Sequence, residues 1–151
     1  FHRYQGMLSG ALLDRIDLQL MHTPSAPKVD SETSVAIQQR VEQAYNRQLD
    51  RSAVQNARLI LDELKPVVLH NNVMKRHFLN YYQSAKWSLR KQRSILSVTL
   101  TIADLELIHP TKKHLDEAVA LSAFSTKVSK GELKRTTYKR PTVVLGPNIK
   151  V

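Results

Sequence analysis

Residues 88–105 read SLRKQRSILSVTLTIADL, and this stretch decides the fold class. Apolar side chains recur in it at spacings of three, four and three: Ile95, Val98, Ile102 and Leu105. This is the period of an α-helix with one apolar face. Ser88 precedes the first turn and is a good N-cap, because its hydroxyl accepts a hydrogen bond from a free backbone N–H. The stretch therefore predicts a helix with one buried side.

The same period continues on both sides of this helix. Upstream, Asp30 or Ser31 is expected to cap a first helix, whose apolar face is Ile37, Val41, Ala44, Tyr45 and Leu49. An irregular stretch over 52–65 with a short helical turn follows, and Pro66 suits the first turn of a second helix that runs to Ala85. Downstream, His109 and Pro110 end the third helix, and Thr111 is expected to cap a fourth.

The N-terminal part has a different pattern. Residues 15–21, RIDLQLM, alternate polar and apolar side chains as a strand does. Pro24 and Pro27 lie in a linker. We therefore predict a mainly α protein: a small α/β remnant with one strand over 1–23, a linker over 24–30, a four-helix domain over 31–124 and a basic extension over 125–151.

Composition narrows the classes of function. The 151 residues include 23 Lys or Arg and 13 Asp or Glu, a net charge of +10, and no Cys. The charge favours polyanionic partners such as nucleic acid, although a solvated basic surface is the alternative. The lack of cysteine excludes disulfides and thiolate metal sites. No stretch has the length of an apolar membrane span, so we expect no membrane partner and a cytoplasmic location.

No complete active site is present in the sequence. The four glycines form no G-x-x-x-x-G-K-[ST] loop for phosphates. The six histidines form no H-E-x-x-H pair, so no metal site is expected and exposed or capping imidazoles are the better interpretation. The chain alone is therefore not expected to be an enzyme.

Two arginines have settings that suit phosphate. Arg15 lies where a loop enters the predicted strand, although an ion pair with Asp14 or Asp17 is the simpler explanation. Arg90 lies in the first turn of the third helix, where free N–H groups and the helix dipole favour an anion. A solvated basic turn is the alternative for Arg90.

Nucleic-acid contacts are a further hypothesis. Cations alternate with aromatic rings between Lys75 and Trp87, as phosphate and stacking contacts require, but core packing is the better explanation for at least one of Tyr81 and Tyr82. Residues 125–151 hold seven Lys or Arg and one Glu, a net charge of +6. The candidate contacts are Lys86, Lys91, Arg93, Lys134, Arg135, Lys139 and Arg140.

Several blocks resemble the Mg-chelatase-like AAA+ ATPases of the ComM (YifB) group. They are residues 9–18 (SGALLDRIDL), 88–90 (SLR), 95–98 (ILSV), 101–105 (TIADL) and 114–118 (HLDEA). Shorter matches, VEQA at 41–44 and Asn56-Ala57, fall in the same order. The resemblance covers roughly residues 3–122 and departs from the family where Ser94 and Leu100 replace arginines and Ala11 replaces proline.

The resemblance implies roles for both arginines. Arg15 corresponds to the arginine finger, which acts in trans on a neighbouring subunit's ATP, and Arg90 corresponds to sensor 2, which reaches nucleotide phosphate from the helical lid. The nucleotide-binding loop, the acidic strand that coordinates Mg²⁺ and sensor 1 would all precede Phe1. ATP and Mg²⁺ would then be bound by the full-length parent and not by this piece.

The expected function is therefore that of a C-terminal lid. Its parent would be a homo-oligomeric ring, of six subunits, that couples ATP hydrolysis to remodelling of DNA or of a protein partner. The alternative is a stand-alone basic helical module that binds nucleic acid. A purely structural interaction domain is the third hypothesis.

Overall fold

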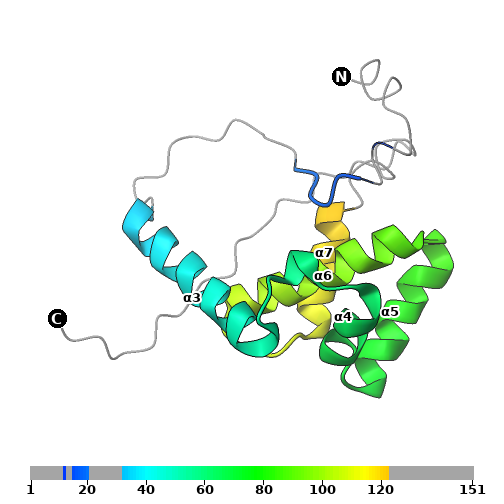
Figure 1. Ribbon diagram of the computed structural model, residues 1–151. Coiled ribbons are helices and arrows are strands. Elements are labelled where there is room, and N and C mark those ends of the chain that lie inside the picture. The colour runs from blue at the N-terminus through cyan, green and yellow to red at the C-terminus, as the bar shows by residue number, and fades with distance from the viewer. Residues whose placement is uncertain (1–11, 13–14, 21–31, 123–151) are drawn as a thin grey trace, which may run out of the picture.

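The computed structural model describes residues 12, 15–20 and 32–122, and these residues fold as a helical bundle (Figure 1). Its elements in chain order are α3 (Ser34–Ser52), the 3₁₀ turn η1 (Asn56–Arg58), α4 (Leu61–Val68), α5 (Asn72–Ala85), α6 (Leu89–Leu105) and α7 (Lys112–Ser122). The predicted mainly α class is confirmed. Among the described residues no helix has the length and apolar character needed to cross a membrane.

Helix α6 is the centre of the bundle. It packs against α7, α4, α3 and η1, so it has neighbours on several sides. The core consists of Leu59, Leu64, Val68, Leu69, Met74, Phe78, Ile95, Leu96, Leu100, Leu115 and Ala118. Of the predicted face, Ile95 is fully buried, whereas Val98 and Ile102 are only partly buried. Full burial of each large apolar side chain contributes roughly 1.5–3 kcal/mol, so this core is the main source of stability.

The N-cap of α6 is the residue that the sequence predicts, whereas that of α3 is not. The Ser88 hydroxyl accepts a hydrogen bond from the Lys91 amide at 3.1 Å, as predicted for the start of α6. Helix α3 begins later than expected, because Thr33 is its N-cap and accepts from the Ala36 amide at 3.3 Å. The expected caps, Asp30 and Ser31, lie outside the described residues.

The predicted second helix is two helices, so the described part of the chain has five α-helices and not four. Pro66 lies inside α4 and not in a first turn. The chain leaves this helix after Val68, and Asn71 starts α5 by accepting a hydrogen bond from the Met74 amide at 2.9 Å. A good N-cap, Asn71, three residues before the apolar Met74, therefore divides the predicted helix.

The N-terminus of α7 lies where the sequence predicted it, but its contacts differ. Thr111 directly precedes α7, and its amide donates to Nδ1 of His114 at 3.2 Å. Nε2 of the same imidazole lies 3.0 Å from Oε2 of Glu106. Because Nδ1 accepts, the ring is the Nε2–H tautomer and donates to Glu106. A buried His114 thus satisfies the helix start, in agreement with the capping interpretation of the histidines.

The predicted strand at the N-terminus does not form within residues 15–20. Arg15 lies in a turn, Asp17 in a bend, and the remaining residues are irregular. A strand needs a neighbour that repeats the backbone hydrogen bonds, and the backbone contact that this segment makes with the bundle is a bond from the Gln19 amide to the Leu121 carbonyl, at 2.8 Å. Polar–apolar alternation alone was therefore not enough to predict a strand here. The rest of the expected region 1–23, the linker 24–30 and the extension 125–151 lie outside the described residues.

Candidate functional site

The segment that carries Arg15 lies against the N-terminal half of α6. The Ser94 hydroxyl donates to Oδ1 of Asp17 at 2.6 Å, and Ser94 is buried. Arg15 is two residues before Asp17, and Arg90 is one helical turn before Ser94. Ser94, one of the positions where the sequence departs from the family pattern, thus joins the two arginine-bearing segments.

Both arginines are exposed. Within residues 15–20 and 32–122 neither guanidinium has a hydrogen bond or ion pair. The alternative of an Arg15–Asp17 ion pair is therefore not realised, since Asp17 accepts from Ser94. Asp14 lies outside the described residues. Both permanently charged groups are thus accessible to a ligand.

The start of α6 is electrostatically suited to an anion. Its first turn contains no acidic residue, yet Arg90 and Lys91 both lie in it. The ammonium group of Lys91 donates to the Ser122 carbonyl at 3.1 Å, at the C-terminal end of α7, where a cation is favourable. Arg90 has no comparable carbonyl or carboxylate among the described residues. An anion beside Arg90 would therefore relieve an unfavourable charge–dipole interaction.

Two of the nucleic-acid candidates are engaged in structural contacts. Arg93 donates through Nε to the Leu59 carbonyl at 2.8 Å and through Nη2 to the Ala57 carbonyl, so it fastens η1 to α6. Lys91 joins α6 to α7, as described above. Lys86 is exposed and is the left-handed C-cap of α5, with φ of 49°. The candidates Lys134, Arg135, Lys139 and Arg140 lie outside the described residues.

The aromatic residues beside these cations divide into one packed ring and one exposed ring. Tyr81 stacks on Trp87 with ring centroids 6.0 Å apart, and its hydroxyl donates to Oδ1 of Asp116 at 2.9 Å. His77 contacts the same carboxylate. Burial, with the hydrogen bond and the negative charge of Asp116, raises the pKa of Tyr81 above 10.0. Tyr81 is thus a packing residue, as core packing predicted for at least one of the pair, whereas Tyr82 is exposed.

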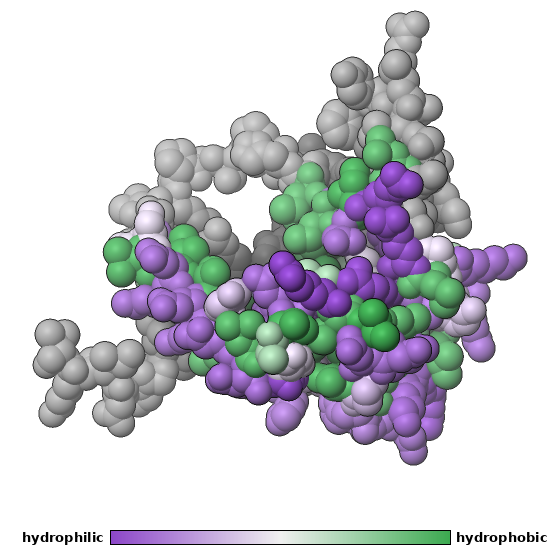
Figure 2. Space-filling model, viewed as in Figure 1, coloured by the Kyte–Doolittle hydropathy of each residue, from purple (hydrophilic) through white to green (hydrophobic). Residues whose placement is uncertain are grey.

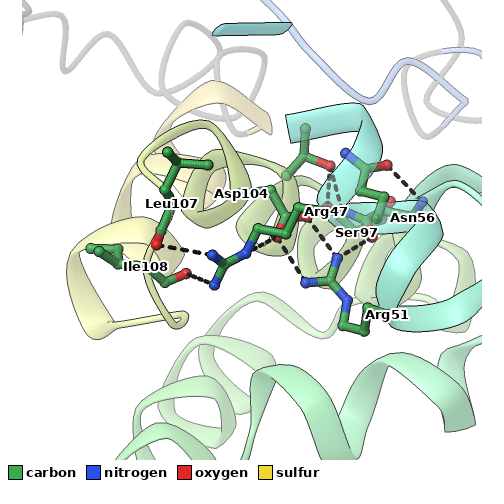
Figure 3. A network of polar contacts seen from close by, with 9 residues as sticks. Arg47, Arg51, Asn56, Ser97, Asp104, Leu107 and Ile108 are labelled. Atoms are coloured by element: carbon green, nitrogen blue, oxygen red, sulfur yellow. Dashed lines mark hydrogen bonds and ion pairs between the residues drawn. The ribbon is translucent and has the colours of Figure 1, made fainter. Parts of the chain in front are cut away.

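A buried polar network was missed by the sequence analysis (Figure 3). Asp104 of α6 is fully buried and accepts from Nη1 and Nη2 of Arg51 at 2.8 and 2.7 Å. Its Oδ2 also accepts from Nδ2 of Asn56 at 2.9 Å, and Nε of Arg47 lies 3.3 Å from Oδ1. The network joins α3, η1 and α6 around one carboxylate. The available signals were the TIADL and Asn56-Ala57 blocks, which were noticed only as part of the resemblance.

Two further contacts extend the network. The guanidinium of Arg47 donates to the carbonyls of Leu107 and Ile108 at 3.0 and 3.2 Å, just beyond the end of α6. The Asn56 amide donates to Oε1 of the buried Gln48 at 3.0 Å. Nε of Arg51 is buried without a hydrogen-bond partner, whereas both of its terminal nitrogens are bound. The contacts of this network hold α3 and η1 against α6.

Metal coordination has no support in the described residues. No cluster of three or more His, Asp or Glu side chains in 15–20 and 32–122 has the arrangement needed to hold a metal ion. The candidate binding groups in this part of the chain are cationic: the exposed guanidinium of Arg90 at the N-terminus of α6 and that of Arg15 in a turn.

A family assignment agrees with this helical bundle and its network. Residues 31–122 match the family described as magnesium chelatase, subunit ChlI C-terminal, and these residues begin beside α3 and end with α7. The chain belongs to this family and is a Mg-chelatase-like member of the AAA+ proteins.

Two curated relatives are proteins called "Uncharacterized protein YifB". The protein of Salmonella typhimurium (strain LT2) is 34% identical over 139 residues, which cover 80% of this chain and 25% of the relative. The protein of Escherichia coli (strain K12) is 33% identical over 129 residues, with 80% of this chain and 25% of the relative covered. The chain thus spans about a quarter of the length of these relatives.

Proposed function

We propose that this chain is the C-terminal lid portion of a ring-forming AAA+ ATPase. The proposal is supported by the family assignment and, above all, by the exposed Arg90 in an acid-free first turn of α6. A nucleotide phosphate is the anion that such a site would bind in a protein of this family. In this role Arg90 is the sensor 2 residue and contacts the phosphates of its own subunit's nucleotide.

Arg15 has a second role in the proposal. It is the arginine finger, which stabilises the charge that develops on the transferred phosphoryl group of a neighbouring subunit's ATP. Its guanidinium is exposed and has no partner among residues 15–20 and 32–122, so it is available across an interface. The Asp17–Ser94 contact lets a change in the position of α6 move the segment that carries Arg15.

ATP and Mg²⁺ belong to the full-length parent in this proposal. When bound, they supply the phosphoryl group and the charge neutralisation needed for its transfer. Arg90 is the residue proposed to contact the phosphate, and other parts of the parent would hold Mg²⁺, since no metal-binding cluster lies within residues 15–20 and 32–122. The lid alone is therefore expected to have no ATPase activity.

In this proposal, ring assembly brings Arg15 of one subunit to the nucleotide of the next. We propose a homo-oligomeric ring of six cytoplasmic subunits, in which ATP hydrolysis changes the position of each lid and so remodels DNA or a protein partner. DNA is supported by the net charge of +10 and by the +6 of residues 125–151. The stand-alone nucleic-acid module receives less support, because Lys91 and Arg93 are both bound to backbone carbonyls.

The test is Arg90→Ala in the full-length parent. Loss of the phosphate contact should lower ATPase turnover at least tenfold, since removal of one preorganised charge-stabilising group can cost about 10²–10³. Arg76→Ala, which removes an exposed arginine from α5, is the matched control and should leave turnover unchanged. Unchanged turnover in Arg90→Ala, with the thermal midpoint preserved, would remove the sensor 2 assignment.

Mixed rings test Arg15 and decide which subunit each arginine serves. Subunits with Arg15→Ala and subunits with a defective nucleotide-binding loop should partly restore activity when mixed, because a finger acts across the interface. The same mixture with Arg90→Ala subunits should not restore activity if Arg90 acts on its own subunit's nucleotide. A failure of Arg15→Ala to complement would contradict its role in trans.

A further inference from the structure

The outer face of α5 carries a regular row of side chains. Lys75, Leu79 and Tyr82 follow each other at i, i+4 and i+7, and Lys86 comes four residues later as the C-cap. Lys75, Leu79 and Tyr82 therefore lie along one side of the helix, and Lys86 follows at its end in a left-handed conformation. The buried residues of α5 are Met74 and Phe78, which face the core. We call Lys75, Leu79, Tyr82 and Lys86 the α5 ridge.

The α5 ridge is exposed although it contains large apolar groups. Leu79 is 47% exposed and Tyr82 is 38% exposed. No side chain of the ridge forms a hydrogen bond or ion pair with the described part of the chain. The neighbouring Tyr81 differs, since it stacks on Trp87 and binds Asp116. Figure 2 shows that hydrophilic and hydrophobic areas alternate on the visible surface of the described residues.

Charge on α5 has a single sign. The helix contains no Asp or Glu, and Arg76 adds a third cation next to the ridge. The acidic residue that contacts α5 is Asp116 of α7, and it is already engaged by His77 and Tyr81. The ridge therefore presents two apolar side chains flanked by uncompensated positive charge.

We propose that the α5 ridge is a docking surface for an acidic amphipathic helix of a protein partner. Apolar residues at i+4 and i+7 match the ridge-and-groove packing of one helix on another. Glutamate or aspartate beside the partner's apolar stripe would pair with Lys75 and Lys86. This inference stands on the surface of α5 and is independent of the proposed ATPase function.

Positive charge argues against two other occupants of the α5 ridge, the rest of this chain and a second copy of it. The segments of this chain outside the described residues hold nine Lys or Arg and three Asp or Glu, so the ridge would repel them. A second copy carries a net charge of +10. Single-stranded nucleic acid is disfavoured because stacking requires successive accessible rings, and the ridge has one, Tyr82. The remaining match in both charge and shape is an acidic helix.

The experiment uses the 151-residue chain and a fluorescein-labelled synthetic peptide of about 18 residues as the probe. The peptide has leucine at i, i+4 and i+7 positions and glutamate beside them. A peptide of the same composition with scattered leucines is the shape control, and a thymidine oligonucleotide of about 20 nucleotides is the nucleic-acid arm. Binding is measured by fluorescence anisotropy at low and at moderate salt, and sedimentation reports self-association.

We expect the amphipathic peptide to bind and the scattered peptide to bind at least about fivefold more weakly. Leu79→Ala should weaken peptide binding about fivefold, because it removes apolar area from the contact. Lys75→Gln with Lys86→Gln should weaken binding by a similar factor and reduce its salt dependence. Arg40→Gln with Arg58→Gln removes two charges outside α5 and should have no effect. Circular dichroism checks that each variant is folded.

Four results would overturn the proposal. The first is equal binding of both peptides, which would show attraction of charge alone. The second is tighter binding of the oligonucleotide that depends on the lysines and not on Leu79, which would assign the ridge to nucleic acid. The third is self-association that Leu79→Ala abolishes, and the fourth is no binding of the amphipathic peptide at either salt concentration. None of these four results would bear on the sensor 2 role of Arg90, which is tested separately by the ATPase turnover of Arg90→Ala.

Discussion

Replacement of Asp104 by asparagine removes the centre of the polar network. The carboxylate of Asp104 accepts two hydrogen bonds from Arg51 and one from Asn56, and forms an ion pair with Arg47. Asparagine has nearly the same shape but only one acceptor oxygen. Its amide N–H₂ group would face the donors that now point at the second oxygen. The substitution therefore creates no cavity and tests the charge and hydrogen bonds directly.

The magnitude follows from burial. Asp104 is fully buried, and the side chain of Arg51 is 22% exposed. Removal of one partner from a buried ion pair costs about 3–5 kcal/mol. Because Arg51 keeps some solvent contact, we expect the lower end, a loss of about 3 kcal/mol in the free energy of unfolding. For a domain of this size the melting temperature should fall by roughly 12–24 °C.

Urea unfolding measures this loss through the single tryptophan, Trp87, which packs against Phe78 and Tyr81. The matched control is Asp62→Asn. Asp62 forms an exposed pair with Lys65, and its replacement should cost under about 1 kcal/mol. A loss below about 1 kcal/mol for Asp104→Asn as well would refute the reasoning, because the buried carboxylate would then contribute no more than a surface pair.

Two other predictions concern α5–α7 and the start of α6. The pKa of Tyr81 is raised, so its phenol stays protonated in the folded protein at a pH where the unfolded phenol ionises, and the free energy of unfolding should fall as pH rises above 10.0. Tyr81→Phe should reduce this fall, as measured by urea unfolding between neutral and alkaline pH. An unchanged pH dependence would contradict the assignment. Ser88→Ala should lower the free energy of unfolding by about 1 kcal/mol through loss of the N-cap bond to the Lys91 amide, and no measurable loss would show that solvent replaces this cap.

Local signals were sufficient for the centre of the fold. Ser88 and the apolar spacing after it predicted α6, because a cap and a helical period depend on residues close in sequence. The same signals misplaced the start of α3, since Asp30, Ser31 and Thr33 are all good caps and the sequence does not rank them. The split between α4 and α5 was missed because the N-cap at Asn71 lies within one continuous apolar pattern, which by itself predicts an unbroken helix.

Contacts between distant residues could not be predicted in this way. Asp104 meets Arg51 and Asn56 across 53 and 48 residues of chain, and no local pattern pairs them. The two arginine candidates, Arg15 and Arg90, came from their settings and from the resemblance, and their exposure agrees with both. Arg93 was a candidate nucleic-acid contact, whereas its guanidinium binds the backbone carbonyls of Ala57 and Leu59.

The extent of burial along α3 also could not be predicted. Ile37 and Val41 share the apolar period with Ala44, but they are 42% and 53% exposed while Ala44 is buried. Periodicity identifies the apolar side of a helix, and it does not tell how far the neighbouring helix extends. Figure 1 shows the N-terminal half of α3 leading away from the bundle.

The way α3 is attached has a consequence for its motion. Its buried residues are Ala44 and Gln48, and its ties to the bundle are the polar contacts of Arg47, Arg51 and Gln48. Helices α4 to α7 keep the apolar core among themselves. Because α3 buries few side chains, we expect local opening to begin at this helix, so its amides should exchange with solvent faster than those of α6. Because the carboxylate at the centre of this attachment is buried, added salt should screen it only weakly, and α3 should stay docked at ionic strengths that weaken exposed pairs such as Arg40–Glu32.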